Sequence, residues 1–452
     1  MKKKNDQLDF NFSRPIDFQR NLSLNFVDQI LFVIDNEYKK NLIYSKHFKF
    51  LILELFFCWT ESSNQMLTVS MSKRGYLSES RYNPNKISSY LIKIVKFLKS
   101  SGFIEFYPGF YDTVTMKSRL SRIKASAKLV DLFRKLKVSE KMKVNHPKRE
   151  FVIKMDGNKK VQYSDDFETQ DVKEIMFNYN EIITKTIFDV PMLEKPYITR
   201  FDNKKILIST SGSQANFIFS DDIKKNFKID GCWWNKLDYD FLKFYAKHII
   251  VNDKPTSFFN LNENFNYFLK KKIGIEYFFK KKDLENFSRS QICNLIVKGI
   301  NSKSFKSFFR SILQEKKKYF DTANLSAKQI KRRMEIFIQD NQPLSNYFFK
   351  EYKLQWEEFL NEVFYKLLQK CVPANIPVFM IKDKIYFSTD FSRLIKENLE
   401  KILEGALGLK KIKLSYVECL SYNFKSRGFF SKILKSDTPL SKRYEQRIKQ
   451  FK

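Results

Sequence analysis

This sequence has few of the residues that build the commonest catalytic and cofactor sites. Its 452 residues include eleven glycines, five cysteines and only three histidines, His47, His146 and His248. The histidines are far apart and no two cysteines form a CxxC pair, which argues against a zinc site and a disulfide framework. The lack of both a GxxxxGK[ST] loop and a GxGxxG turn argues against an NTPase motor and a dinucleotide-dependent enzyme.

Long uncharged apolar runs are also missing. The strongest run, Phe48–Trp59, is shorter than a membrane span and contains Glu54, so it is typical of a buried helix. The amino terminus, Met1–Gln7, is charged and lacks the apolar block that follows in a signal peptide. The sequence therefore predicts a cytoplasmic protein without membrane contact, and scattered cysteines fit a reducing compartment.

Positive charge is the most abundant compositional signal. The chain has 83 Lys and Arg against 50 Asp and Glu, a formal net charge of +33. Such a field attracts polyanions, and nucleic-acid binding through it weakens steeply with salt. AT-rich codons favour Lys, Asn, Ile, Phe and Tyr, all abundant here, so the base composition of the gene is an alternative source of part of this charge.

Residues 66–128 have the order of a winged helix-turn-helix. Between Pro84 and Gly102, apolar residues recur at three- and four-residue steps, which predicts a helix with a polar, lysine-rich outer face. Phe103–Phe106 and Phe110–Tyr111 follow as a predicted strand, turn and returning strand, and a basic cluster comes next. The side chains expected on nucleic acid are Arg81, Lys86, Ser89, Lys93, Lys117, Arg119, Arg122 and Lys124. The alternative is a small helical domain with an ordinary solvated lysine face.

A second constellation lies in the C-terminal third. Predicted helices Leu354–Cys371 and Phe391–Leu403 flank two short strands, Ile376–Ile381 and Ile385–Phe387. Asp383 lies between the strands, where polymerase palms present a metal-binding aspartate. An acidic residue at a tight turn also serves turn chemistry alone.

Several sequence blocks carry a resemblance to a known family. The first are 80–84, 102–105, 108–112 and 118–125, and later ones are 219–234, 249–269, 289–301 and 376–387. In this order they resemble a poorly characterised bacterial and phage-borne family with an N-terminal winged helix and a region similar to the palm and fingers of family A DNA polymerases. The resemblance implies that 249–269 contains motif A, 289–301 the fingers helix and 376–387 the motif C hairpin.

The polymerase motifs are degenerate in this chain. Asn260 stands where motif A would place its aspartate, and the motif C His-Asp-Ser is replaced by a sequence with Asp383 between Lys382 and Lys384. Cys293 occupies the expected place of the lysine that meets the triphosphate. Two-metal nucleotidyl transfer needs at least two carboxylates, so the resemblance implies a palm that has lost catalysis and kept its affinity for nucleic acid.

Other carboxylates and charges bear on this site. Asp253 and Glu263 are the candidates to replace the missing carboxylate. An ion pair of Asp383 with Lys382 or Lys384 is expected, because a metal-free site would leave these opposite charges side by side. The catalytic positions are thus Asp383, Asn260 and Arg289, with no metal and no cofactor expected in the inactive form and Mg²⁺ in an active one.

The predicted fold is α+β, with an N-terminal winged helix-turn-helix followed by a polymerase-like palm and fingers domain. The predicted division is 1–135 for the winged helix, 136–195 for a basic linker and helix, and 196–452 for the polymerase-like domain with a basic tail.

The leading hypothesis for function is a DNA-binding replication-type protein of a mobile element or phage, with DNA favoured over RNA and the palm inactive. One alternative is an active template-dependent nucleotidyltransferase, like a DNA polymerase or primase. A second is a nonenzymatic protein-interaction module.

Overall fold

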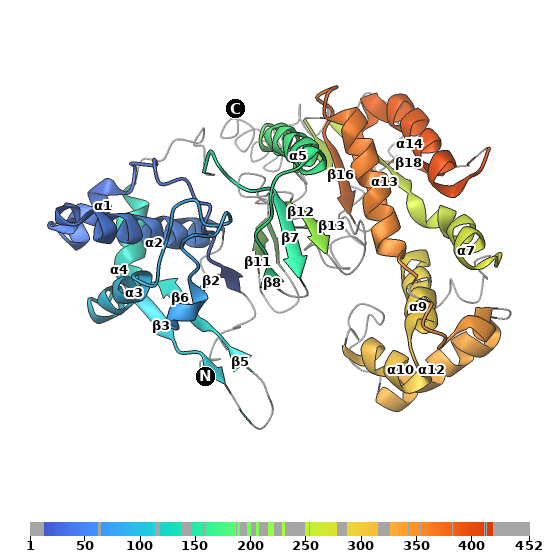
Figure 1. The fold of residues 1–452 in the computed structure, drawn as a ribbon, viewed down its shortest axis with the longest axis horizontal. Helices are drawn as coiled ribbons and strands as arrows, with labels where there is room; N and C mark the ends of the chain where they lie inside the picture. The colour runs from blue at the N-terminus through green and yellow to red at the C-terminus, as the bar shows by residue number, and fades with distance from the viewer. Residues whose placement is uncertain are drawn as a thin grey trace, which may run out of the picture.

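The structure is a computed structural model with a mixed α+β fold. It describes residues 13–61, 65–111, 113, 118–136, 146–156, 159–186, 188–189, 197–199, 205–207, 216–220, 228–230, 249–252, 254–277, 287–314, 326–341, 344–352, 354–381, 383–410, 412 and 414–418. Buried apolar side chains form an N-terminal core and a larger C-terminal core. Figure 1 shows the corresponding units side by side, and we call residues 13–136 the N-terminal unit and 146–418 the C-terminal unit.

The N-terminal unit combines helices with a four-stranded sheet. Its helices are α1 (Asp28–Ile34), α2 (Leu42–Glu61), α3 (Leu91–Ser100) and α4 (Ala127–Arg134). Its strands are β1 (Ser13–Pro15), β2 (Met66–Val69), β3 (Ile104–Tyr107), β4 (Phe110–Tyr111), β5 (Ser118–Arg119) and β6 (Ser121–Ala125). The sheet has the order β1-β2-β6-β3, with β1 parallel to β2 and the other pairs antiparallel.

Helix α3 begins later than the sequence predicts. Instead of starting at Pro84, it starts at Leu91, because the Asn83 side chain closes a loop by bonding the backbone N–H and carbonyl of Ile87. Lys86, inside this loop, has a φ of 51°, which a right-handed helix excludes. The predicted stop is confirmed: Gly102 has a φ of 72°, and the next N–H bonds back to the Leu98 carbonyl.

The strand pairing after α3 also differs from the prediction. Strand β3 pairs with β6, and β4 pairs with β5, so the expected short hairpin between 103–106 and 110–111 is wrong. A Cβ on Gly109 would lie 2.3 Å from the Arg119 carbonyl oxygen, so glycine lets the chain pass its partner closely here. The four strands therefore form one longer antiparallel ribbon, which we call the β3–β6 hairpin.

A buried carboxylate holds the first described strand to the N-terminal core. Glu54 of α2 is fully buried and accepts hydrogen bonds from Arg14 at 3.0 Å and Arg20 at 2.6 Å. It also accepts from the backbone N–H of Asp17 at 2.9 Å. Because charged groups are stable in a core only when paired, β1 and the chain after it depend on this one side chain.

The C-terminal unit is built around a six-stranded sheet. Its order is β16-β17-β15-β14-β9, and β18 pairs with β15. The strands are β9 (Phe188–Asp189), β14 (Ile250–Val251), β15 (Lys254–Asn260), β16 (Val378–Ile381), β17 (Lys384–Ser388) and β18 (Tyr416–Glu418). The helices associated with it are α5 (Phe167–Thr184), α7 (Phe265–Ile273), α13 (Trp356–Cys371) and α14 (Ser392–Leu407).

The segment predicted as a linker is part of the C-terminal core. Strand β7 (Val152–Asp156) pairs with β8 (Lys159–Lys160), and it also pairs in parallel with β12 (Asn216–Ser220). Strand β13 (Lys228–Asp230) completes this sheet, and β10 (Tyr197–Thr199) pairs separately with β11 (Lys205–Leu207). On α5, Tyr179 is buried and donates to the Val378 carbonyl at 2.7 Å. These contacts revise the predicted boundary, because apolar side chains from 151 to 183 share the core of the later elements.

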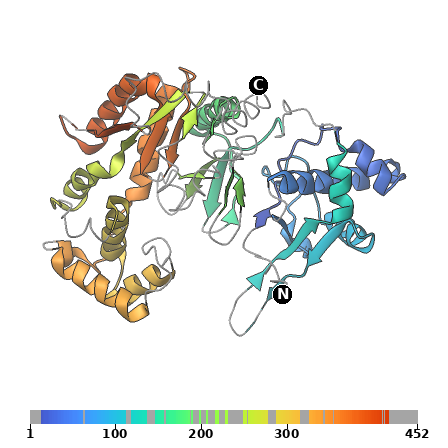
Figure 2. The same cartoon turned by 180° about the vertical axis from the view of Figure 1, so that it is seen from behind.

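Three helices project from the C-terminal unit as an arm. They are α9 (Arg289–Asn301), α10 (Phe305–Gln314) and α12 (Ala327–Asp340). Figures 1 and 2 both place this helical arm on the side away from the N-terminal unit. Helix α9 ends at Asn301, the last residue of the block that the resemblance assigns to a fingers helix, and the backbone of Ser302 is extended. Within the described ranges, no helix is long and apolar enough to cross a bilayer.

Replacing Glu54 tests the buried carboxylate. We expect Glu54→Gln to lower the free energy of unfolding by about 3 kcal/mol, since it leaves two guanidinium groups without their buried counter-charge. Urea denaturation followed by circular dichroism measures this change. Glu37→Gln is the matched control, because the Glu37 carboxylate pairs with Lys40 on the surface. Its loss should lower the free energy of unfolding by less than about 0.5 kcal/mol. Equal effects of the two variants would contradict the proposed role of Glu54.

Candidate functional site

Helix α3 presents a lysine face to solvent. Lys93, Lys96 and Lys99 are exposed at three-residue spacing, while the opposite face is buried in the N-terminal core. The Lys99 ammonium lies 4.8 Å from the ring centroid of Phe106 on β3, so the lysine face reaches the β3–β6 hairpin. Three flexible donors on one helix face suit contacts to a phosphate backbone.

Two arginines lie near the end of the same hairpin. The Arg119 guanidinium lies 5.2 Å from the Phe110 ring centroid and donates to the Pro108 carbonyl at 3.2 Å. Arg122 donates to the Leu120 carbonyl at 2.8 Å. Burial and then the positive charge of Arg119 lower the pKa of Arg122. An anion between the two guanidinium groups would relieve this repulsion.

The other residues of this unit that were predicted to contact nucleic acid do not all lie on the lysine face of α3 or on the hairpin. Lys124 is on the same face of β6 as Arg122, but it lies opposite Glu105 of β3. Lys86 and Ser89 precede α3 instead of lying on it, because the chain loops there, and the Lys86 ammonium is 3.5 Å from Glu79. Lys117 lies outside the described residues.

The Arg81 guanidinium binds residues of the C-terminal unit. It bonds Glu150 through Nε at 2.9 Å and Asp165 at 2.7 Å, and it stacks 3.5 Å from the Tyr163 ring centroid. It lines a cavity of about 600 Å³ beside Glu150 and Lys173. These contacts leave the Arg81 guanidinium committed to the C-terminal unit, and it is not a nucleic-acid contact of α3 as predicted. Its partners lie 69 to 84 residues further along the chain, so no local pattern could have revealed them.

His47 holds the loop that leads into α3. Its Nδ1–H donates to the Ile43 carbonyl at 2.7 Å, and its Nε2 accepts from the backbone N–H of Ser88 at 2.9 Å. Only the neutral imidazole can make both bonds. Burial is the main cause that lowers the pKa of His47, and the charge of Lys46 lowers it further.

In the C-terminal unit, the structure brings Asn260 and Asp383 together. Asn260, the last residue of β15, lies opposite Lys384 of β17, and the next N–H, that of Leu261, donates to the Asp383 carbonyl at 2.8 Å. The Asp383 side chain is buried and accepts a hydrogen bond from the side-chain amide of Asn262. We call this group the Asp383 site.

Of the two carboxylates that could complete a metal site, the described one is engaged in an ion pair. Glu263 accepts from Arg289 at 2.8 Å, and Asp253 lies outside the described residues. Of the two lysines expected as ion-pair partners of Asp383, Lys384 has its ammonium over the Phe258 ring instead, 4.7 Å from the ring centroid. Lys382 lies outside the described part of the chain. Where the chain is described, no group of three His, Cys, Asp or Glu side chains could hold a metal ion.

Cys293 and Asn264 are two further buried side chains in this part of the C-terminal unit. Burial, and then the charge of Asp383, raise the pKa of the Cys293 thiol well above its usual value, so this thiol is a poor nucleophile. Asn264 is 1% exposed, and neither side-chain polar atom has a hydrogen-bond partner among the described residues. The alternation of Asn260, Asn262 and Asn264 was the sequence signal for this amide-rich corner, and only Asn260 was among the predicted site residues.

Comparisons with known proteins leave the function to be argued from this geometry. No protein-family model, curated protein or solved structure matches the chain. The lysine face of α3 and the arginines of the β3–β6 hairpin are therefore the main support for a function.

The neutral state of His47 predicts a pH dependence. Because folding lowers its pKa below the usual value of 6.5, the unfolded chain takes up the proton first as the pH falls. Stability from this group is complete above pH 6.5 and is lost as the pH falls through the lower folded pKa. We expect the free energy of unfolding to fall less between pH 7.5 and 5.5 in His47→Gln than in the unmodified protein. If urea denaturation gave the same change in the free energy of unfolding with pH for His47→Gln and the unmodified protein, this role of His47 would be contradicted.

Proposed function

We propose that this chain is a DNA-binding protein of the replication type found in mobile elements and phages. Its N-terminal unit selects the nucleic-acid site, and its C-terminal unit holds the strand in a palm-like framework without catalysing nucleotide transfer. The observation that carries the proposal is the lysine face of α3 next to the paired arginines of the β3–β6 hairpin.

The connectivity of the N-terminal unit supports a winged helix. Helix α2 leads into β2, a turn-rich segment leads into α3, and the β3–β6 hairpin follows, with strand order β2-β6-β3. In this arrangement α3 takes the place of the recognition helix and the hairpin that of the wing. A short apolar-backed helix with lysines outward then enters a groove, while the wing arginines meet the flanking phosphates.

The helical arm supports a second nucleic-acid surface. Exposed cations on α10 and α12 outnumber the acidic side chains on these helices, Glu335 and Asp340. The cations are Lys306, Arg310, Lys328, Lys331, Arg332 and Arg333. If the N-terminal unit lay on the duplex and the helical arm lay on a neighbouring stretch of strand, the arm would add phosphate contacts. Binding to DNA would then weaken more steeply with salt.

The Asp383 site supports a palm without turnover. The β16–β17 hairpin presents Asp383 next to the end of β15, which is the arrangement that the motif order implies. Its neighbour at the motif A position is the neutral amide of Asn260, and the nearest alternative, Glu263, is neutralised by Arg289. Two Mg²⁺ ions need more negative charge than one buried carboxylate provides.

Substituting the hairpin arginines tests DNA binding. We expect Arg119→Ala/Arg122→Ala to weaken binding to a duplex at least about tenfold and to reduce the salt slope by about 2, since two phosphate contacts are lost. Fluorescence anisotropy at several salt concentrations measures both. Arg134→Ala/Arg393→Ala removes the same charge from exposed helix positions. This control should change the affinity and the salt slope much less than the hairpin variant does. Binding that does not respond to salt or to the hairpin variant would sink the proposal.

Primer extension tests the absence of turnover. With a primed template and Mg²⁺ or Mn²⁺, we expect no incorporation above that of a buffer control, because the second metal-holding carboxylate is missing. Asp383→Asn should leave DNA affinity within about twofold of the unmodified protein. Extension that disappears in Asp383→Asn would make a template-dependent nucleotidyltransferase the better function.

A further inference from the structure

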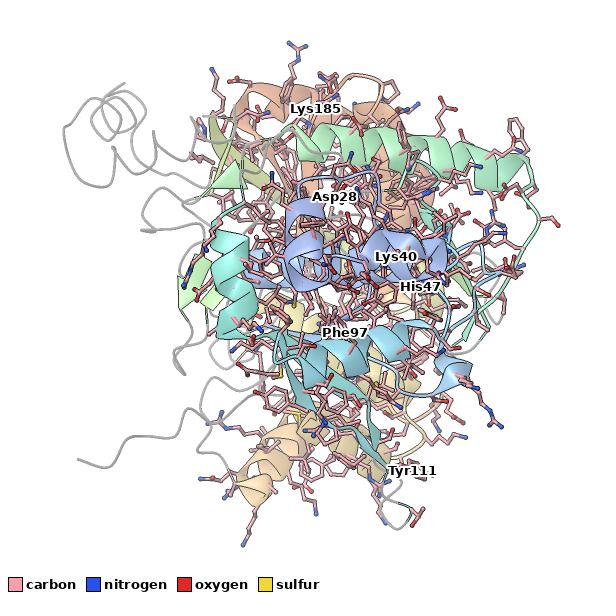
Figure 3. All side chains as sticks on the ribbon, turned by 90° about the vertical axis from the view of Figure 1, so that its left-hand side faces the viewer. Asp28, Lys40, His47, Phe97, Tyr111 and Lys185 are labelled. Carbon is pink, nitrogen blue, oxygen red and sulfur yellow. The ribbon has the colours of Figure 1, made fainter. Side chains whose placement is uncertain are left out.

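The end of the β3–β6 hairpin exposes aromatic side chains. Phe110 and Tyr111 form β4, and 51% and 61% of their surfaces are accessible. Tyr111 is labelled in Figure 3, at the end of the strands that lead away from the helix carrying Phe97. Two adjacent aromatic residues at a projecting position bury little surface on folding, so their contribution to the core is small.

Arginine side chains accompany these rings. Phe110 lies opposite Arg119 in the β4–β5 pairing, with the guanidinium over the ring, and Arg122 follows three residues later. The combination of exposed aromatic rings and guanidinium groups is the chemistry of single-strand binding, in which bases stack on the rings and phosphates meet the cations. A protein partner with an apolar surface would have no need of the paired positive charge.

The bases of a continuous duplex cannot reach such rings. Their faces are covered by the neighbouring base pairs, and a base must be unstacked at a cost in free energy before it can meet a ring. Unpaired bases next to a duplex end have free faces and can stack at once. Because α3 and the hairpin belong to one small unit, the lysine face can lie on duplex phosphates while the hairpin end meets the first unpaired bases.

We propose that Phe110 and Tyr111 each stack with an unpaired base, one on either face of β4, with Arg119 beside Phe110. The preferred ligand of the N-terminal unit is then a junction between duplex and single-stranded nucleic acid. This inference rests on the proposed function and names the form of nucleic acid that the same surface recognises.

Three DNA probes and one double variant test the site. A blunt duplex, the same duplex with a ten-nucleotide single-stranded extension, and the single strand alone are titrated with the full chain by fluorescence anisotropy. We expect the junction to bind about tenfold more tightly than the blunt duplex, and Phe110→Ser/Tyr111→Ser to remove this advantage while leaving blunt-duplex affinity unchanged. 2-Aminopurine at the first unpaired position should be quenched on binding to the unmodified protein and not to the variant.

Two controls separate stacking from structure. Phe32→Ser/Val33→Ser removes an equally exposed apolar pair on α1, which lies apart from β5 in Figures 1 and 2, and should leave junction preference unchanged. Phe110→Tyr/Tyr111→Phe keeps both rings and should retain the preference and the quenching.

The outcomes distinguish the two proposals. Equal affinity for junction and blunt duplex, or a junction preference that survives Phe110→Ser/Tyr111→Ser, would overturn the stacking site and favour a protein partner for these rings, while DNA binding itself stood. Lack of binding to all three probes would overturn the proposed function, and the stacking site with it.

Discussion

The ion-pair network around Glu150 joins the two units, and the relation between the two basic surfaces depends on it. Glu150 binds Arg81 and Lys173 and accepts from the Tyr163 hydroxyl at 2.9 Å, while Asp165 binds the same two cations. Every charge in the group has an opposite charge within reach, which is the condition under which partly buried ions are tolerated. Because Arg81 belongs to the loop before α3, this network holds the lysine face in a defined position relative to the C-terminal unit.

The two units place their polar and charged side chains differently. On α3 the cations face solvent and stay available to phosphates, whereas at the Asp383 site the polar groups face one another. There the Asn262 amide donates to Asp383, and Arg289 pairs with Glu263, so both carboxylates have partners inside the protein. A site arranged in this way holds its shape without a metal and has little negative charge left to attract one.

The spacing of apolar residues predicted a helix well where one face of that helix is buried along its length. The buried face of α3, including Ile94 and Leu98, was read from the spacing of apolar residues, and Gly102 was identified as the helix stop. The start of α3 was missed because Asn83 competes for the backbone groups of Ile87 through its side chain. Local side-chain bonds of this kind leave no trace in the hydrophobic pattern.

The order of sequence blocks also predicted that Asn260 and Asp383 would be neighbours, although 123 positions separate their numbers. It could not reveal that Glu263 would pair with Arg289 or that Lys384 would turn to Phe258, since those choices depend on side-chain positions across separate elements.

By itself the sequence determined the α+β composition, the positive charge, the apolar face of α3 and the presence of a neutral asparagine at position 260. Each of these is a property of residue type and spacing along the chain. Only the tertiary structure decided which cations stay free for a ligand: Lys93 remains exposed, while Arg81 is consumed by Glu150 and Asp165. The physical reason is that a charge is committed by whichever opposite charge folding brings within a few ångströms, and that distance is set by packing between distant segments.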